Sequence, residues 1–203
     1  MQILHPLGGS PQEYLETLQD PHRWRPTKCP QCDGCESLTA HGFYERSVVD
    51  LSFDGVIRIC RYLCLLCRRT ISLLPEFLLP YLRFSIPMVG RFLKARLLDG
   101  QTLKEAAVSA GLADMPYQRG QHWIRRIVKT AAALAAALVA LTKVDPAPSF
   151  VCRALGMLQT VGWIAAHRFL FSGLRLHLLG WPLFLASAGR CAALPGGAPQ
   201  PVP

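Results

Sequence analysis

Residues 60–75 read CRYLCLLCRRTISLLP, and the cysteine pair CLLC at residues 64–67 within them matches an earlier pair, CPQC, at residues 29–32. A gap of two residues lets one tight turn present both thiolates of a pair to the same metal ion. Two such pairs complete the tetrahedral four-cysteine site that structural zinc prefers. We therefore predict a structural Zn²⁺ ion bound by Cys29, Cys32, Cys64 and Cys67, which would supply this small β-unit with a folding free energy on the order of 10 kcal/mol.

Two further cysteines leave the ligand set open. Cys35 and Cys60 lie three and four residues from predicted ligands, and either could replace one of them in a shifted register. The CxxC pairs have the better geometry, so we expect Cys60 to pack on the hairpin. Ordinary unliganded cysteines are the main alternative to a metal site. A redox pair at CPQC is disfavoured because no βαβ pattern accompanies it.

The residues between the two pairs show the period-two alternation of strands. Strands are predicted at residues 38–42, 44–51, 56–62 and 70–74. The pair Asp-Gly within residues 53–55 favours positive φ angles and predicts the hairpin turn there. The hairpin would bring the two cysteine pairs together.

Helical patterning dominates the rest of the chain. Ser10 with Glu13 and Thr102 with Glu105 form capping boxes, and prolines break the connector at residues 75–87. The predicted helices cover residues 10–20, 85–98, 102–111 and 116–142.

This pattern predicts an α+β protein in which a small β zinc ribbon precedes a helical, helix-turn-helix-like domain and an irregular helical apolar region. The predicted units are an N-terminal helix and linker at 1–24, the zinc ribbon at 25–82, the helix-turn-helix-like domain at 83–145, and an apolar C-terminal region with a disordered tail at 146–203.

The charge distribution favours a polyanionic partner. The formal net charge is +9, and all acidic residues lie at or before Asp145. Each phosphate that a basic side chain neutralises releases counterions, so an excess of this size promotes binding to nucleic acid. A solvated basic surface without a partner is the alternative.

The segment from residue 102 to residue 129 has the features of a helix-turn-helix. Ala107 would let two helices approach, and Gly111 would form the turn. The next helix would place its first residues at base edges and its later basic residues at phosphates. Trp123 and Ile127 would form its buried stripe, although Gly120 falls where such motifs usually carry an apolar residue. The predicted DNA contacts are Tyr117, Gln118, Arg119, Gln121, His122, Arg125, Arg126 and Lys129.

The segments CPQC, LTAHGFYER and IRICRYLCLLCRRTISLLPEFLLPY, followed by this motif, resemble the N-terminal region of bacterial insertion-sequence transposases and a related family of stand-alone proteins. In these proteins a zinc ribbon precedes a helix-turn-helix that binds the ends of the element. The resemblance covers roughly residues 25–130 and is most specific at residues 64–75. It implies zinc at the four cysteines and DNA contact from the helix that begins near Pro116.

Complete transposases add a catalytic domain in which three separated carboxylates hold two metal ions. After Asp114 the only carboxylate side chain here is that of Asp145, so such a triad cannot be assembled downstream. We therefore predict a zinc-dependent protein that binds double-stranded DNA and is not an enzyme, with no small-molecule substrate. A plain three-helix unit with a basic outer face is the alternative to the helix-turn-helix.

A second hypothesis makes the ribbon a protein-docking module and the apolar C-terminal region the surface of a homodimer. The aromatic side chains expected to form that surface are Trp163, Phe169, Phe171, Trp181 and Phe184.

The predicted location is the cytoplasm, in association with the nucleoid. The first twenty residues lack the basic and long apolar regions of a secretory signal. The longest uncharged runs after residue 129 have only 13 or 14 residues, whereas a membrane span needs about 18. No membrane span is therefore expected.

Overall fold

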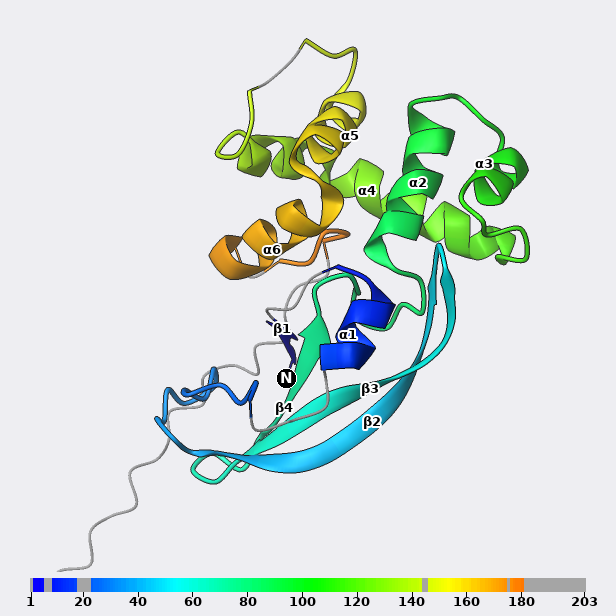
Figure 1. The fold of residues 1–203 in the computed structure, drawn as a ribbon. Helices are drawn as coiled ribbons and strands as arrows, with labels where there is room; N and C mark the ends of the chain where they lie inside the picture. Colours follow the sequence, from blue (N-terminus) through cyan, green and yellow to red (C-terminus); the bar gives the residue numbers. More distant parts are fainter. Residues whose placement is uncertain (1, 6–8, 18–22, 144–145, 175, 181–203) are drawn as a thin grey trace, which may run out of the picture.

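The computed structural model describes residues 2–5, 9–17, 23–143, 146–174 and 176–180. Its architecture is α+β, with a curved sheet and the first helix at one end of the molecule and the later helices at the other (Figure 1). The sheet contains β1 (Gln2–His5), β2 (Leu38–Asp50), β3 (Phe53–Cys64) and β4 (Thr70–Pro75). The helices are α1 (Pro11–Thr17), α2 (Ile86–Leu97), α3 (Leu103–Ser109), α4 (Tyr117–Leu138), α5 (Phe150–Val161) and α6 (Trp163–Leu174). The predicted fold class is confirmed.

The sheet has the strand order β1-β4-β3-β2, and a long antiparallel hairpin of β2 and β3 forms its outer half. Side chains alternate between its faces. Ile57 and Ile59 pack with Tyr14 of α1 and with Phe77 on one face. The other face carries a second apolar cluster that contains two of the four motif cysteines, with Cys29, Leu38, Cys60, Tyr62, Cys64, Ile71 and Leu73.

The predicted position of the hairpin turn is wrong. Asp50 pairs with Phe53, so the turn consists of Leu51 and Ser52, and Asp54 and Gly55 lie inside β3. The φ angle of Gly55 is not positive. The register that puts Ile57 and Ile59 on the buried face outweighs the local turn preference of the Asp-Gly pair.

Two other features of the sheet differ from the prediction. Residues 38–42 and 44–51 were expected as two strands, whereas β2 is continuous and contains a register shift between Ala40 and Phe43. Gly42, with φ +81°, lies at this irregularity and supplies the positive φ angle. Strand β1 was not predicted, and it pairs in parallel with β4.

The helices begin where the capping signals predicted. The hydroxyl of Ser85 accepts the amide of Met88 at the start of α2, and Thr102 and Glu105 form both bonds of a capping box at α3. Helix α4 starts after Pro116 and is also close to its predicted bounds.

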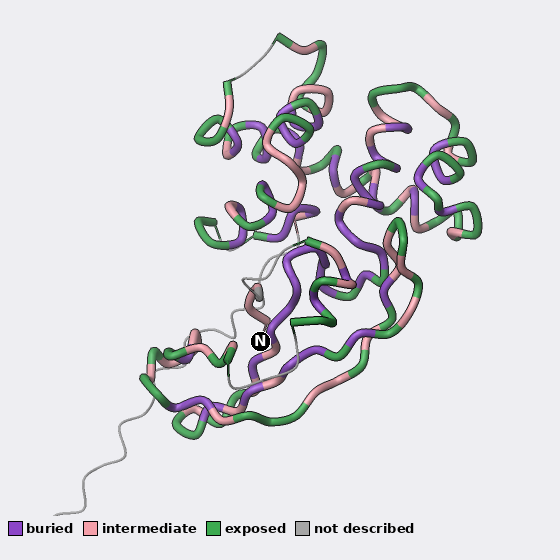
Figure 2. Tube along the Cα trace, viewed as in Figure 1, coloured by how far each residue is buried: buried purple, intermediate pink, exposed green. Residues whose placement is uncertain are grey.

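One apolar core joins all the helices from α2 onward. It contains Phe92 of α2 and Trp123 of α4, whose rings meet edge to face at 5.6 Å, together with Leu155 of α5 and Leu170 of α6. The described residues after position 146 therefore contribute to this core, and they form two helices up to Leu174 (Figure 2). The predicted disordered tail lies outside the described residues.

A short backbone exchange attaches the helices to the sheet. The amide of Val49 donates to the carbonyl of Arg83 at 2.8 Å, and the carbonyl of Val49 accepts the amide of Ser85 at 3.0 Å. The Ser85 hydroxyl also donates to the carboxylate of Asp50. The residue that caps α2 is therefore held by the end of β2.

A buried polar cluster links the connector after β4 to α6. The buried carboxylate of Glu76 accepts two bonds from the guanidinium of Arg168, one of them at 2.8 Å from Nε to Oε1. The Glu76 carbonyl oxygen can only accept, so Nδ1 of His167, 3.2 Å away, must donate. Nε2 of His167 then accepts the Nδ1–H of His177 at 3.0 Å. Burial of both rings favours the neutral form of each imidazole, with which this chain of hydrogen bonds is compatible.

The histidine pair makes stability depend on pH. Burial lowers the pKa of His167 from 6.5 to about 4 and that of His177, which also faces His167, to about 3. The unfolded chain binds more protons than the folded chain below about pH 6.5. The stabilisation is complete above that pH and is lost as the pH falls towards 4, by on the order of 3 kcal/mol for His167.

We therefore expect the free energy of unfolding, measured in urea between pH 7 and pH 4.5, to fall less steeply in His177→Asn than in the wild type. The exposed His41→Asn variant is the control and should follow the wild type. The thiolate of Cys64, whose pKa is about 6, protonates in the same range, so the quantity that decides is the difference between variants in how the free energy of unfolding changes with pH. Parallel curves for all three proteins would contradict the assignment.

Helix α4 has a glycine at position 120, where helix-turn-helix motifs usually carry an apolar residue, and the packing of α4 on α2 explains why. A Cβ atom there would lie 2.7 Å from Cζ of the buried Phe92 ring and 3.2 Å from Cε of Met115. At Gly156 in α5, by contrast, an added Cβ would have no atom within 4 Å. The ring of Phe92 fills the space that a side chain at position 120 would otherwise occupy.

Gly120→Ala should destabilise the protein by about 1–2 kcal/mol, because overpacking costs more than the gain in helix propensity. Gly156→Ala should instead stabilise it by up to about 1 kcal/mol. Urea unfolding midpoints of the two variants test this, and a shift of both in the same direction would be inconsistent with the packing of α4 on α2.

Candidate metal centre

The two cysteine pairs form turns with the same backbone hydrogen bonds. In each turn the residue after the second cysteine donates its amide to the carbonyl of the first cysteine, from Asp33 to Cys29 and from Arg68 to Cys64, both at 2.9 Å. The amide of the first cysteine donates to the carbonyl of the residue five positions later, at 3.0 Å in both turns. Asp33 and Arg68 have φ angles of 56° and 57°. The two turns are therefore local copies of one structure.

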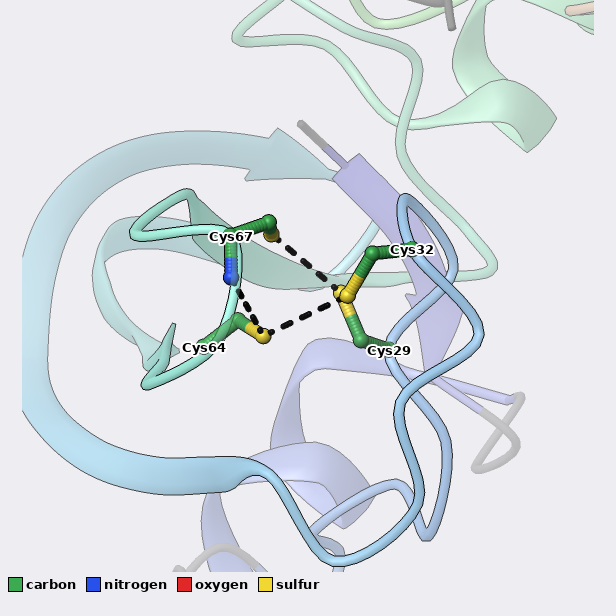
Figure 3. Close-up of side chains that lie close together, drawn as sticks. All are labelled: Cys29, Cys32, Cys64 and Cys67. Carbon is green, nitrogen blue, oxygen red and sulfur yellow. Dashed lines mark hydrogen bonds between the residues drawn. The ribbon is translucent and has the colours of Figure 1, made fainter. Parts of the chain in front are cut away.

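The hairpin brings these turns face to face, so that the four sulfur atoms converge (Figure 3). Sγ of Cys29 lies 3.8 Å from Sγ of Cys67, and Sγ of Cys32 lies 3.7 Å from Sγ of Cys64. All four sulfurs lie within 4.8 Å of one another. A tetrahedral zinc–thiolate site with bonds of about 2.3 Å has sulfurs about 3.8 Å apart. The cluster therefore fits a metal ion such as zinc.

The hydrogen bonds around the sulfurs favour the thiolate of Cys64. Burial raises the pKa of Cys29, and it raises that of Cys67 to about 12. At Cys64 this effect of burial is outweighed by the Ser37 hydroxyl, 3.3 Å from Sγ, and by the amides of Cys67 and Leu66. The pKa of Cys64 is lowered to about 6. Cys64 therefore ionises before Cys29 and Cys67. Ser37 belongs to no motif, so the sequence alone did not reveal its role.

Cys35 and Cys60 do not join the cluster. Cys60 is buried in the apolar cluster on the cysteine face of the sheet, where burial raises the pKa of its thiol to about 11. Cys35 is exposed, with Sγ 4.0 Å from the carbonyl oxygen of Asp33. Cys152 is half-buried in α5, and Cys191 lies outside the described residues. Within the described part of the chain, the sulfurs that converge are those of the two CxxC pairs.

The residues predicted to contact DNA lie on the first half of α4, which rests on the core through Trp123 and Ile127. Five of them are exposed, and Arg119, Gln121 and Arg126 are half-buried. The guanidinium of Arg119 lies 5.5 Å from the centre of the Phe84 ring. The exposed members are Tyr117, Gln118, His122, Arg125 and Lys129.

Helix α3 and the start of α4 pack as a helix pair. Ala107 is buried, and Gly111 has a φ angle of 73° in the connection that leads to α4. The amide of Leu112 donates to the carbonyl of Ala107 at 2.7 Å and closes this turn. Ala107, predicted to let two helices approach, is thus buried in α3, and Gly111, predicted to form the turn, lies in the turn.

The aromatic residues expected on a dimer surface are largely used within the chain. Phe171 is buried, and Trp163 and Phe169 are half-buried against the helical core. The indole of Trp163 packs on Gly90 of α2. Trp181 and Phe184 lie outside the described residues. In the described part of the chain, no helix is both long and apolar enough to cross a membrane.

Residues 29–110 match the family model described as a domain of unknown function (DUF6431). The matched segment begins at the first cysteine of the cluster, includes all four, and ends between α3 and α4. Comparison with the curated proteins and with the solved structures gave no match. The similarity therefore covers the metal centre, the sheet after β1, and α2 and α3.

We expect the full chain to contain one zinc ion, measured by elemental analysis, and Cys32→Ser or Cys67→Ser to lose it and to unfold at lower temperature. Cys35→Ser and Cys152→Ser are matched controls that change cysteines outside the cluster. Substitution with Co²⁺ should give the intense visible absorption of tetrahedral thiolate coordination. Full metal content in Cys32→Ser, or loss of metal in Cys35→Ser, would show that the ligand set is wrong.

Proposed function

We propose that this protein is a zinc-stabilised DNA-binding protein without a catalytic domain of its own, and that it is related to the N-terminal regions of insertion-sequence transposases. The observation that carries the proposal is the first half of α4, which presents amide, imidazole and guanidinium side chains beside a buried stripe. Double-stranded DNA is the proposed partner, in the cytoplasm at the nucleoid.

The chemistry of α4 suits the major groove. Gln118 and His122 are exposed near the start of the helix, where such helices contact base edges. Arg125 and Lys129 follow at spacings of three and four residues, on the same side as His122. Their charges match the phosphates that flank a groove. The hydrogen bond from Arg125 to Gln121, at 3.2 Å, orients the guanidinium along the helix.

Residues 83–129 carry nine basic and three acidic side chains, a local excess of six (9 − 3). This excess supports a polyanionic partner for the helical part. The four-cysteine cluster supports a structural role for the metal in this proposal, because it has four sulfur donors and such closed sites leave no position for a substrate.

Substituting both Arg125 and Arg126 by Ala should weaken binding to a duplex by at least tenfold. It should also lower the slope of log K against log salt by about 1.8, because each lost phosphate contact contributes about 0.9. Fluorescence anisotropy of a labelled duplex at several salt concentrations measures both quantities. Arg91→Ala, which removes one exposed positive charge from α2, is the control and should leave both quantities nearly unchanged.

Arg126 is half-buried, so a second pair, Arg125→Ala with Lys129→Ala, changes only exposed side chains. Wild-type affinity in a folded, zinc-loaded sample of this second pair would exclude α4 as the recognition helix. Absence of any salt-dependent duplex binding by the wild type would remove the proposal itself.

A further inference from the structure

The sheet carries an open groove of about 640 Å³ on the face opposite the cysteine-containing cluster. It lies where the four strands meet residues 81–83, the loop that follows the buried segment 73–80. Its wall contains Arg46, Arg61 and Arg83 together with Tyr44 and Tyr81. The remaining lining residues among those described carry hydroxyl, amide or aliphatic side chains and no carboxylate: Gln2, Ser47, Thr70, Ser72 and Leu82.

Tyr81 is the unusual residue of this groove. It is 78% exposed although it directly follows the continuously buried segment 73–80. Its φ angle of 61° is in the left-handed region, which is rare for a bulky side chain. A conformation of this kind costs free energy and is retained only when the surroundings enforce it.

Arg46 enforces that conformation. One of its Nη atoms donates to the carbonyl of Leu79 at 2.5 Å and to the carbonyl of Leu82 at 2.6 Å. These two carbonyls belong to residues on either side of Tyr81, the residue with the positive φ angle. The guanidinium therefore holds the loop against the edge of β2 and keeps the Tyr81 ring at the rim of the groove.

Arg61 and Arg83 supply positive charge to the lining of the groove. Arg61 is half-buried on β3, opposite Ser72 of β4. Arg83 is exposed, and its ion pair with the carboxylate of Asp54 is long, at 3.8 Å, and joins two exposed side chains. Such an exposed pair is weak and exchanges readily for a phosphate.

We propose that this groove binds single-stranded DNA, with a base stacked on Tyr81 and the adjoining phosphates at Arg61 and Arg83. A strand that tracks arginines and stacks bases on exposed aromatic rings is the usual mode of single-strand binding, and it tolerates any base sequence. The groove volume of about 640 Å³ is on the scale of ordinary ligand pockets. This site is separate from the proposed duplex contact on α4 and does not depend on it.

The test uses the full zinc-loaded chain and a fluorescein-labelled octathymidylate, with anisotropy as the readout. Tyr81→Gly removes the ring and relieves the positive φ angle, so it should bind roughly tenfold more weakly while its thermal midpoint stays equal or rises. Tyr81→Phe keeps the stacking surface and should bind within about twofold of the wild type. Tyr117→Ala removes another exposed tyrosine, on α4, and should leave octathymidylate binding intact.

A second arm separates this site from the duplex site. Arg61→Gln should weaken octathymidylate binding and leave duplex binding nearly unchanged, whereas Arg125→Ala with Lys129→Ala should do the opposite. Unchanged octathymidylate affinity in Tyr81→Gly, or equal losses in Tyr81→Gly and Tyr81→Phe, would overturn the proposal. Loss of octathymidylate binding in the α4 pair, with Arg61→Gln unaffected, would assign single-strand binding to α4 and overturn it as well.

Discussion

The arrangement of the whole molecule depends on the backbone exchange between Val49 and residues 83–85. The hairpin of β2 and β3 holds a metal-binding cluster at one end, and this exchange fixes the first turn of α2 at the other. Because Ser85 is both the helix cap and a partner of Asp50, α2 cannot rotate without losing its cap. A strand of 13 residues extends over about 40 Å, so the hairpin acts as a long strut between the two parts.

This distance explains what the metal centre can contribute. The cysteine turns tie residues 29–32 to the end of β3, in a segment that buries few large side chains of its own. The groups that shape α4 belong instead to the helical core, where Trp123 packs between Phe84 and Phe92. Phe84 directly follows one of the residues that Val49 holds. The cluster therefore stabilises the frame on which α4 is supported, and its sulfurs lie far along the strand from that helix.

Local chemical signals in the sequence predicted the parts of the structure that local chemistry determines. Two CxxC pairs located the cluster, and Thr102 with Glu105 located a helix start, because both act over a few residues. The predicted turn at Asp54 and Gly55 was wrong because burial of Ile57 set the register over the whole hairpin. Strand β1 pairs with β4, which lies far along the chain, and a strand of four residues is too short to carry a sequence pattern that predicts this pairing. The groove could not be predicted from the sequence for the same reason, because its arginines come from two strands and a loop.

Arg83 lies between the groove of the sheet and the start of α4. It lines the groove of the sheet, and it also lines a second hollow of about 390 Å³ beside Phe84, Pro116 and Arg119 at the start of α4. Its guanidinium and that of Arg119 lie against the same Phe84 ring, at 5.3 and 5.5 Å from its centre. The same hollow is also lined by Asp54 and Asp114, and Asp54 is the carboxylate that pairs with Arg83. These carboxylates lower the positive potential between the groove and α4. The charge arrangement thus agrees with two separate candidate sites for nucleic acid, one in the groove and one on α4.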